Sequence, residues 1–155
     1  MMQQNDPMPT RPYKVLVVDD DPYLNEVLVA SMRVLGGFEV LTAFDGAEGL
    51  ILCIEHQPDI IIIDVRMPEL DGYQLVRALR GDPATADLPL IILSAMVQDH
   101  NTKIGLYSGA DRYLRKPIDP HTLVEIMHDV IKIDAQQRLT RMAALAQEAE
   151  ETDVR

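Results

Sequence analysis

The stretch that decides the fold is IIIIDVRMPELDG, residues 60–72. Four isoleucines follow one another without a polar residue between them, and the run ends at the carboxylate of Asp64. An uninterrupted run of β-branched residues is typical of a strand buried on both faces, as in a parallel sheet. A buried, unpaired carboxylate is costly, whereas a carboxylate at the carboxyl end of a parallel strand can face the crevice that opens there. Residues 67–72, which contain one proline and one glycine, then predict a loop.

Four further apolar runs of strand length flank this stretch and alternate with helical patterns. Strands are expected at residues 14–18, 38–43, 60–63, 90–93 and 112–114, and helices at about 22–35, 45–54, 73–80, 98–107 and 120–130. Five strand–helix pairs imply a parallel sheet with helices on both faces. Right-handed crossovers leave few arrangements, and the smaller doubly wound order 2-1-3-4-5 fits this length. The predicted fold class is therefore α/β, a doubly wound five-stranded parallel sheet of the flavodoxin-like (βα)5 type with an extended C-terminal helix.

Cap residues mark several of the expected helix ends. Asp21 and Asp119 each precede a proline, which is favoured in the first helical turn. Asp45 and Glu48 have the spacing of a capping box, with Asp in place of Ser or Thr. The glycine pair at 36–37 is expected to end the first helix.

Composition limits the class of protein. A chain of 155 residues favours one domain. The net charge of −11 argues against direct binding to nucleic acid. A lone cysteine, Cys53, and no signal-peptide pattern favour a cytoplasmic protein, and no apolar run is long enough to span a membrane. We expect a flexible tail at residues 1–12, one domain at 13–132 and a helical extension at 133–155.

Polar residues follow four of the five predicted strands. They are Asp19, Asp20, Asp64, Ser94 and Lys116. Because the carboxyl ends of parallel strands share one edge of a sheet, these residues are expected to converge. Three crowded carboxylates repel one another, and Mg²⁺ relieves that repulsion because it prefers oxygen ligands and keeps several waters.

This set of side chains fits phosphoryl transfer to a carboxylate. No histidine lies at a strand end to serve as the base of a serine hydrolase. A metal ion and Lys116 could neutralise phosphoryl oxygens, with Asp64 as the nucleophile. Each residue taken alone also has an ordinary structural interpretation, as a helix cap, a turn residue or a solvated charge. Their conjunction at successive strand ends favours a site.

At this point the sequence resembles the receiver domain of two-component response regulators, over about residues 13–132. The motifs that carry the resemblance are VVDDDP at 17–22, DVRMPELDG at 64–72, ILSA at 92–95 and GADRYLRKP at 109–117. The resemblance implies that Asp64 accepts a phosphoryl group from a phosphohistidine of a sensor histidine kinase or phosphotransfer protein. It also implies that Asp20, Asp64 and the backbone carbonyl of Arg66 bind Mg²⁺ directly, with Asp19 acting nearby through water.

The resemblance further implies a switch. Lys116 pairs first with Asp64 and then with the phosphoryl group, and Ser94 swings in to hydrogen-bond that group. Tyr113 turns inward in the same motion, which changes the surface of the fourth helix, fifth strand and fifth helix and so controls a downstream effector protein or an absent effector domain. New charge and acceptor oxygens that are contacted in one state only can shift a two-state equilibrium.

Two positions that tune phosphoryl lifetime in the family carry unusual residues here, Arg66 and Met96. We hypothesise that Arg66 leans over the phosphoryl group and that Met96 helps to exclude attacking water. The alternative, that both side chains point to solvent, stays open.

The last 23 residues have a heptad pattern of small apolar residues with an acidic end. The residues of this seam are Ala135, Leu139, Met142, Ala146 and Ala149. Two interpretations are open: a solvated extension of the last helix, which we favour, or a lever or homodimer contact that leads to an effector domain.

Two other functional classes compete with a phosphorylatable signalling module that is not a turnover enzyme. A Mg²⁺-dependent phosphatase of the haloacid dehalogenase kind also uses an aspartate nucleophile, and residues 19–21 meet its Asp-x-Asp pattern but 22–23 do not continue it. The other class is a degenerate receiver that only docks partners, and the intact Asp20, Asp64, Ser94 and Lys116 argue against it.

Overall fold

The computed structural model describes residues 11–20, 26–65, 70–95 and 109–153. Its strands are β1 (Lys14–Val18), β2 (Glu39–Ala43), β3 (Ile60–Val65), β4 (Leu90–Ser94) and β5 (Arg112–Arg115). Its helices are α1 (Glu26–Gly36), α2 (Gly46–His56), α3 (Leu70–Gly81), α5 (Pro120–Ile131) and α6 (Ala135–Asp153). The helix expected at 98–107 lies outside the described residues.

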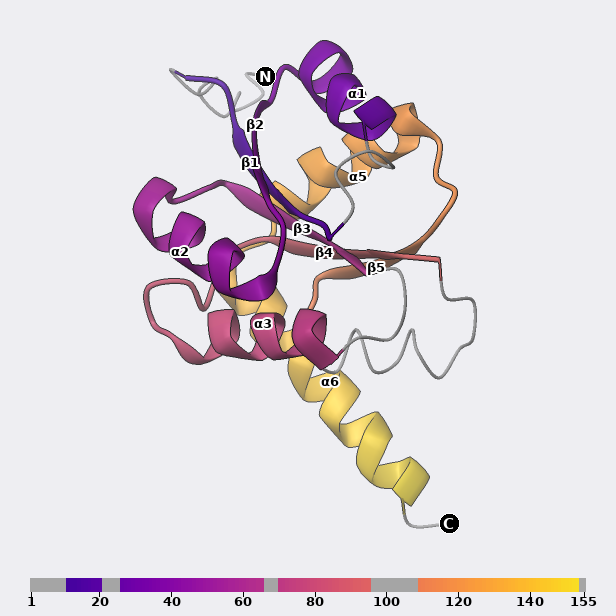
Figure 1. Cartoon of the computed structure of the whole chain (residues 1–155). Helices are drawn as coiled ribbons and strands as arrows, with labels where there is room; N and C mark the ends of the chain where they lie inside the picture. Colours follow the sequence, from indigo (N-terminus) through magenta and orange to yellow (C-terminus); the bar gives the residue numbers. More distant parts are fainter. Residues whose placement is uncertain (1–10, 21–25, 66–69, 96–108, 154–155) are drawn as a thin grey trace, which may run out of the picture.

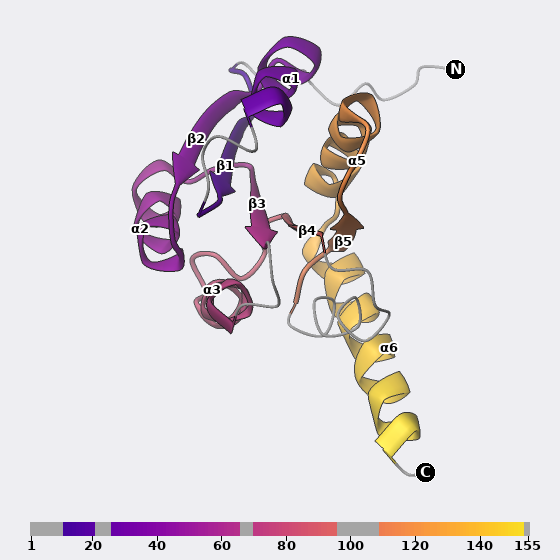
Figure 2. The same cartoon turned by 45° about the vertical axis from the view of Figure 1, so that its right-hand side comes forward.

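The five strands form one parallel sheet in the order β2-β1-β3-β4-β5, as the sequence predicted. Figures 1 and 2 show α1 and α5 together on one face of this sheet and α2 and α3 together on the other. Every strand runs in the same direction, so all five carboxyl ends lie along one edge. That edge is where the candidate site must be sought.

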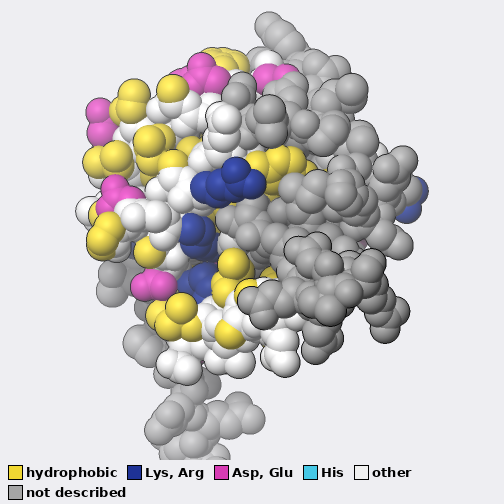
Figure 3. Space-filling view, turned by 90° about the horizontal axis from the view of Figure 1, so that it is seen from below, with side chains coloured by type: hydrophobic (Ala, Val, Ile, Leu, Met, Phe, Trp, Pro, Cys, Tyr) yellow, Lys and Arg dark blue, Asp and Glu magenta, His cyan; other side chains and the backbone are white. Residues whose placement is uncertain are grey.

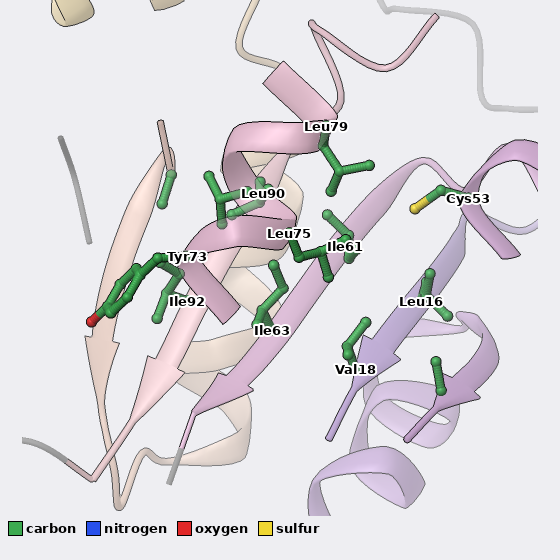
Figure 4. Close-up of a cluster of buried hydrophobic side chains, with 13 residues drawn as sticks. Leu16, Val18, Cys53, Ile61, Ile63, Tyr73, Leu75, Leu79, Leu90 and Ile92 are labelled. Atoms are coloured by element: carbon green, nitrogen blue, oxygen red, sulfur yellow. The ribbon is translucent and has the colours of Figure 1, made fainter. Parts of the chain in front are cut away.

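The isoleucine run of β3 is buried on both faces, as its unbroken pattern indicates. Ile61 and Ile63 pack among residues of the core beneath α2 and α3, where Figure 4 shows them beside side chains of the neighbouring strands. Ile60 and Ile62 belong to the second core, beneath α1 and α5. All four side chains are at most 2% exposed. The central strand is therefore held in place by two apolar layers.

The predicted caps Asp45 and Asp119 fix helix ends as expected, whereas the predicted cap Asp21 lies outside the described residues. The Asp45 carboxylate accepts a hydrogen bond from the Glu48 amide at 2.8 Å, and that of Asp119 accepts from the Thr122 amide at 3.1 Å. Gly37 follows α1 with a φ of 67°, a conformation that favours glycine. The loop expected through residue 72 is wrong in its last part, because α3 already begins at Leu70.

The expectation that the C-terminal extension continues the last helix is also wrong. Helix α5 ends at Ile131, and α6 starts separately at Ala135 with a capping box of its own. The Asp134 carboxylate accepts from the Gln137 amide at 2.7 Å, and the Gln137 side chain accepts from the Asp134 amide at 3.1 Å. The helix is also not simply solvated, because the side chain of Arg138 is buried while Leu139 of the proposed seam is 66% exposed.

Charges are mixed on the face of the molecule seen from below. Figure 3 shows Lys and Arg side chains in a short row, with hydrophobic and acidic side chains around them. Among the described residues, no helix has the length and apolar character needed to cross a membrane.

Candidate functional site

The polar strand-end residues meet at the carboxyl edge of the sheet. Asp19 follows β1 directly, and its amide donates to the Ala43 carbonyl of β2 at 2.9 Å, which extends the ladder by one residue. Asp64 lies in β3, with Ser94 at the end of β4. Lys116 follows β5, and its amide donates to the Ser94 carbonyl at 2.7 Å. The sheet thus brings together residues separated by almost the whole length of the domain.

The Asp64 carboxylate and the Lys116 ammonium form an ion pair, with Oδ2 and Nζ 2.5 Å apart. The Asp64 side chain is 1% exposed and that of Lys116 is 21% exposed. A carboxylate in such a buried position needs an opposite charge, and the lysine supplies it while its own head stays near solvent. The ion pair therefore holds the Asp64 carboxylate at the carboxyl edge of the sheet.

Ser94 sits between the members of this pair in the sheet register. It is the Cα partner of Val65 on one side and of Arg115 on the other. Val65 is the residue after Asp64, and Arg115 is the residue before Lys116. Ser94 therefore pairs with a sequence neighbour of each member of the ion pair. The serine is fully buried, so its hydroxyl is shielded from bulk water.

The acids line a small cavity of about 140 Å³ beside Asp64. Asp19 is 7% exposed and Asp20 is exposed, so one acid lies inside and one at the mouth. The other lining residues come from β1, β3, α2, α3 and the connection between β2 and α2: Val18, Phe44, Asp45, Gly46, Ile63, Gly72 and Leu75. The sequence showed Asp45 only as a helix cap and gave no reason to select Phe44, because their position at the cavity depends on how α2 packs.

The donor set fits a hard cation of the Mg²⁺ type. Within the described residues no three His, Cys, Asp or Glu side chains are arranged to hold an ion by themselves. Mg²⁺ does not require three, because it is commonly held by one or two carboxylates and completes its shell with water. The remaining predicted ligand, the carbonyl of Arg66, lies outside the described residues. The carboxylates around the cavity are therefore suited to a partly hydrated ion.

Gly49 lets α2 approach the acidic end of β1 closely. A Cβ atom at this position would lie 2.9 Å from Cγ2 of Val18, the residue immediately before Asp19. Any larger residue at 49 would have to push α2 or Val18 away. The close approach of α2 thus helps to fix the backbone that presents Asp19.

Tyr113 lies in β5 with its hydroxyl oxygen buried, on the side of the sheet covered by α3. Tyr73, at the start of α3, is 5% exposed, and Figure 4 shows its ring extending from α3 toward β5. The pKa of Tyr73 is raised to about 12, chiefly by burial and in smaller part by the neighbouring Tyr113. The predicted switch tyrosine therefore packs beside a second phenol. The predicted lifetime residues Arg66 and Met96 lie outside the described residues.

Comparison with known proteins agrees with this arrangement. A family model described as the response regulator receiver domain matches residues 15–128. The transcriptional regulatory protein PrrA of Mycobacterium tuberculosis is 47% identical over 104 residues, which are 67% of this chain and 43% of PrrA. The DNA-binding dual master transcriptional regulator RpaA of Synechocystis is 38% identical over 106 residues, which are 68% of this chain and 44% of RpaA. The match thus spans less than half the length of these relatives.

Solved structures show the same fold. The receiver domain of a Francisella response regulator is 38% identical, with a TM-score of 0.68, and the match covers 77% of this chain and 97% of that one. The receiver domain of a sensor histidine kinase from Pseudomonas aeruginosa is 30% identical, with a TM-score of 0.70, covering 79% and 99%. The latter structure has a magnesium ion coordinated in its active site cleft.

Proposed function

The chain belongs to the family of response regulator receiver domains, and from this premise we propose that Asp64 accepts a phosphoryl group from a phosphohistidine of a sensor histidine kinase or phosphotransfer protein. The observation that carries the proposal is the buried Asp64 carboxylate, paired with Lys116 at 2.5 Å beside an acidic cavity. In the transfer, a carboxylate oxygen of Asp64 bonds to phosphorus as the bond from phosphorus to the histidine nitrogen breaks. With a proton on its other ring nitrogen, the histidine leaves as a neutral imidazole, and Asp64 becomes an aspartyl phosphate.

The residues around Asp64 divide the work of this transfer. We expect Lys116 to neutralise a phosphoryl oxygen once it leaves its contact with the carboxylate, and Ser94 to donate a hydrogen bond, and the ion pair and the register of β4 support these roles. When bound, Mg²⁺ would be held by Asp20, Asp64 and the predicted carbonyl of Arg66, with Asp19 nearby, and would supply charge that offsets the phosphoryl oxygens. Arg66 and Met96 remain predicted modulators of phosphoryl lifetime. If an Arg66→Asn protein had an unchanged phosphoryl lifetime, the predicted role of Arg66 would be refuted.

Phosphorylation then acts as a switch on the β5 side of the sheet. The phosphoryl group draws Lys116 and Ser94 toward itself, and both are joined to β5 through the backbone of the β4–β5 pair. Tyr113, in the same strand, is the residue through which we expect the change to reach the surface of the predicted fourth helix, β5 and α5, of which the predicted fourth helix lies outside the described residues. The output is control of an effector domain or partner protein, as the transcriptional regulators among the relatives suggest by analogy. Formation of a homodimer is a further predicted way in which the domain could produce its output.

The competing functions are not favoured. The relatives are regulators rather than phosphatases, and the family match covers the strand-end motifs. The intact set Asp20, Asp64, Ser94 and Lys116 argues against a module that only docks. We therefore expect each molecule to be phosphorylated about once, without turnover of small phosphoesters.

The test is incubation with acetyl phosphate and Mg²⁺, followed by intact-mass measurement. The wild type should gain one phosphoryl group, and Asp64→Ala should gain none. Asp129→Ala, which changes an exposed acid of α5, is the matched control and should label like the wild type. An unlabelled wild type, equal labelling of Asp64→Ala, or steady phosphate release from p-nitrophenyl phosphate would each contradict the proposal.

A further inference from the structure

Helix α6 is fastened to the domain by an arginine that the receiver site does not use. Arg138 is only 5% exposed. Its Nε donates to Oδ1 of Asp111 at 2.7 Å and its Nη2 to Oδ2 at 3.0 Å. Its Nη1 donates to the Asp87 carbonyl at 3.0 Å. This two-pronged geometry uses the rigid fork of the guanidinium and fixes the direction of the helix as well as its position.

Asp111 is also held by the body of the domain. Its Oδ2 accepts from Arg80 Nη2 of α3 at 3.2 Å and from the Leu90 amide of β4 at 2.8 Å. Arg80 in turn donates to the Gly109 carbonyl at 2.8 Å. A single carboxylate, 2% exposed, thus joins α3, β4 and α6.

A second arginine of α6 contacts the same residue. Arg141, one turn after Arg138, donates from Nη1 to the Asp111 carbonyl. Burial lowers the pKa of the Arg141 guanidinium, as expected for a charge drawn against the protein. The face of α6 that carries these arginines is therefore docked, whereas Leu139 points to solvent.

Asp111 occupies the position immediately before β5. The strand runs from Arg112 to Arg115, so Tyr113 lies two residues beyond Asp111 and Lys116 five residues beyond. The Asp111 amide donates to the Leu90 carbonyl at 2.8 Å, and the Lys116 amide donates to Ser94 at the other end. One short strand therefore has α6 fastened at its start and the Asp64 counter-ion at its finish. Figure 2 shows α6 running away from the β5 side of the sheet.

We propose that α6 is an output arm whose docking through Arg138 and Asp111 is energetically coupled to phosphorylation of Asp64, an inference that rests on the proposed function. In the structure Lys116 contacts the Asp64 carboxylate directly, and α6 is docked. Docking therefore favours the unphosphorylated arrangement of β5. A phosphoryl group that recruits Lys116 and Ser94 displaces β5 from that arrangement and loosens α6. Coupling between two sites is reciprocal, so releasing α6 must favour the phosphorylated arrangement.

The experiment uses the full chain with Mg²⁺ and beryllofluoride, an unreactive mimic of the phosphoryl group. Wild type and Arg138→Ala are compared by the apparent affinity for beryllofluoride and by hydrogen–deuterium exchange of the α6 amides. Arg33→Ala, which removes an exposed arginine of α1, is the matched control. Arg138→Lys keeps the charge but loses the fork, and it is the second variant should Arg138→Ala fold poorly.

The expected result has two parts. Beryllofluoride should speed amide exchange in α6 of the wild type, and Arg138→Ala should bind it at least about fivefold more tightly, the low end of allosteric coupling. Arg138→Lys should shift the affinity in the same direction by less, and Arg33→Ala should match the wild type. Wild type that binds beryllofluoride with no change in α6, or an Arg138→Ala affinity that is unchanged or weaker, would overturn the coupling alone. Wild type that fails to bind, like Asp64→Ala, would overturn both the coupling and the proposed function.

Discussion

Replacing Asp111 by Asn should destabilise the whole domain, although the two side chains have nearly the same volume. The Asp111 carboxylate accepts four hydrogen bonds, from Arg138 Nε and Nη2, Arg80 Nη2 and the Leu90 amide, at 2.7 to 3.2 Å. Three of these donors bind Oδ2, and Arg138 Nε binds Oδ1. The Asn side chain can keep the three hydrogen bonds to Oδ2 only if its oxygen takes the place of Oδ2. Its NH₂ group then takes the place of Oδ1 and faces the Arg138 Nε donor. The variant therefore loses one bond outright, gains a donor–donor contact and removes the carboxylate charge that the Arg80 and Arg138 guanidinium groups share.

The magnitude follows from these losses. Removing one partner of a buried ion pair costs about 3 to 5 kcal/mol, and hydrogen bonds to charged groups are each worth about 1.5 to 3 kcal/mol. Because three bonds can survive in weakened form, we expect a loss of about 3 to 4 kcal/mol in the free energy of unfolding. For a chain of 155 residues that corresponds to a fall in Tm of about 6 to 16 °C.

The assay is urea unfolding followed by far-ultraviolet circular dichroism, together with a thermal melt. Asp129→Asn makes the same chemical change on the exposed face of α5 and should alter the free energy of unfolding by no more than about 0.5 kcal/mol. Arg138→Ala should cost less than Asp111→Asn, because Asp111 then keeps Arg80 and the Leu90 amide. A loss below about 1 kcal/mol for Asp111→Asn, with an unchanged m-value, would refute this account of the buried pair.

Three further outcomes are expected. Gly49→Ala should destabilise the domain by about 1 to 2 kcal/mol, because overpacking against Val18 outweighs the gain in helix propensity, whereas Gly81→Ala, whose Cβ would meet nothing within 4 Å, should be tolerated in the same urea titration. Burial raises the pKa of Cys53 from its ordinary 9.0 to about 11, so the unfolded chain loses this proton first and stability should fall by about 2 to 3 kcal/mol as pH rises from 9 to 11. A Cys53→Ala protein should lack that part of the pH dependence, and an identical slope in both proteins would contradict the assignment. Asp45→Ala should cost about 1 kcal/mol by removing the α2 cap, whereas Asp45→Ser should recover most of the loss, as thermal melts can check.

The sequence was sufficient to predict the sheet and the place of the site. An isoleucine run such as residues 60–63 can be satisfied only between two apolar layers, and its burial is a local property that the residues themselves encode. Once five strands are parallel, their carboxyl ends share one edge whatever the details of packing. The meeting of Asp19, Asp64, Ser94 and Lys116 follows from that topology, and the structure places all four there.

Tertiary packing determined the start of α3 and part of the cavity lining, which local sequence patterns did not predict. Residues 71 and 72 read as a loop because Asp and Gly are common turn residues, but the first turn of a helix also accepts an acid, and α3 includes them. Phe44 and Asp45 reach the acidic cavity only because α2 packs closely on β1 at Gly49. No periodicity in the chain carries that information.

The C-terminal helix shows the same division most clearly. Sequence periodicity correctly indicated a helix after residue 133, because helix propensity and spacing act over a few residues. It could not reveal that Arg138 is buried against Asp111, 27 positions earlier, since a charged residue in a helix ordinarily lies in solvent. Only the tertiary structure brings that carboxylate beneath α6, and the high cost of leaving either charge buried alone is what makes the contact specific.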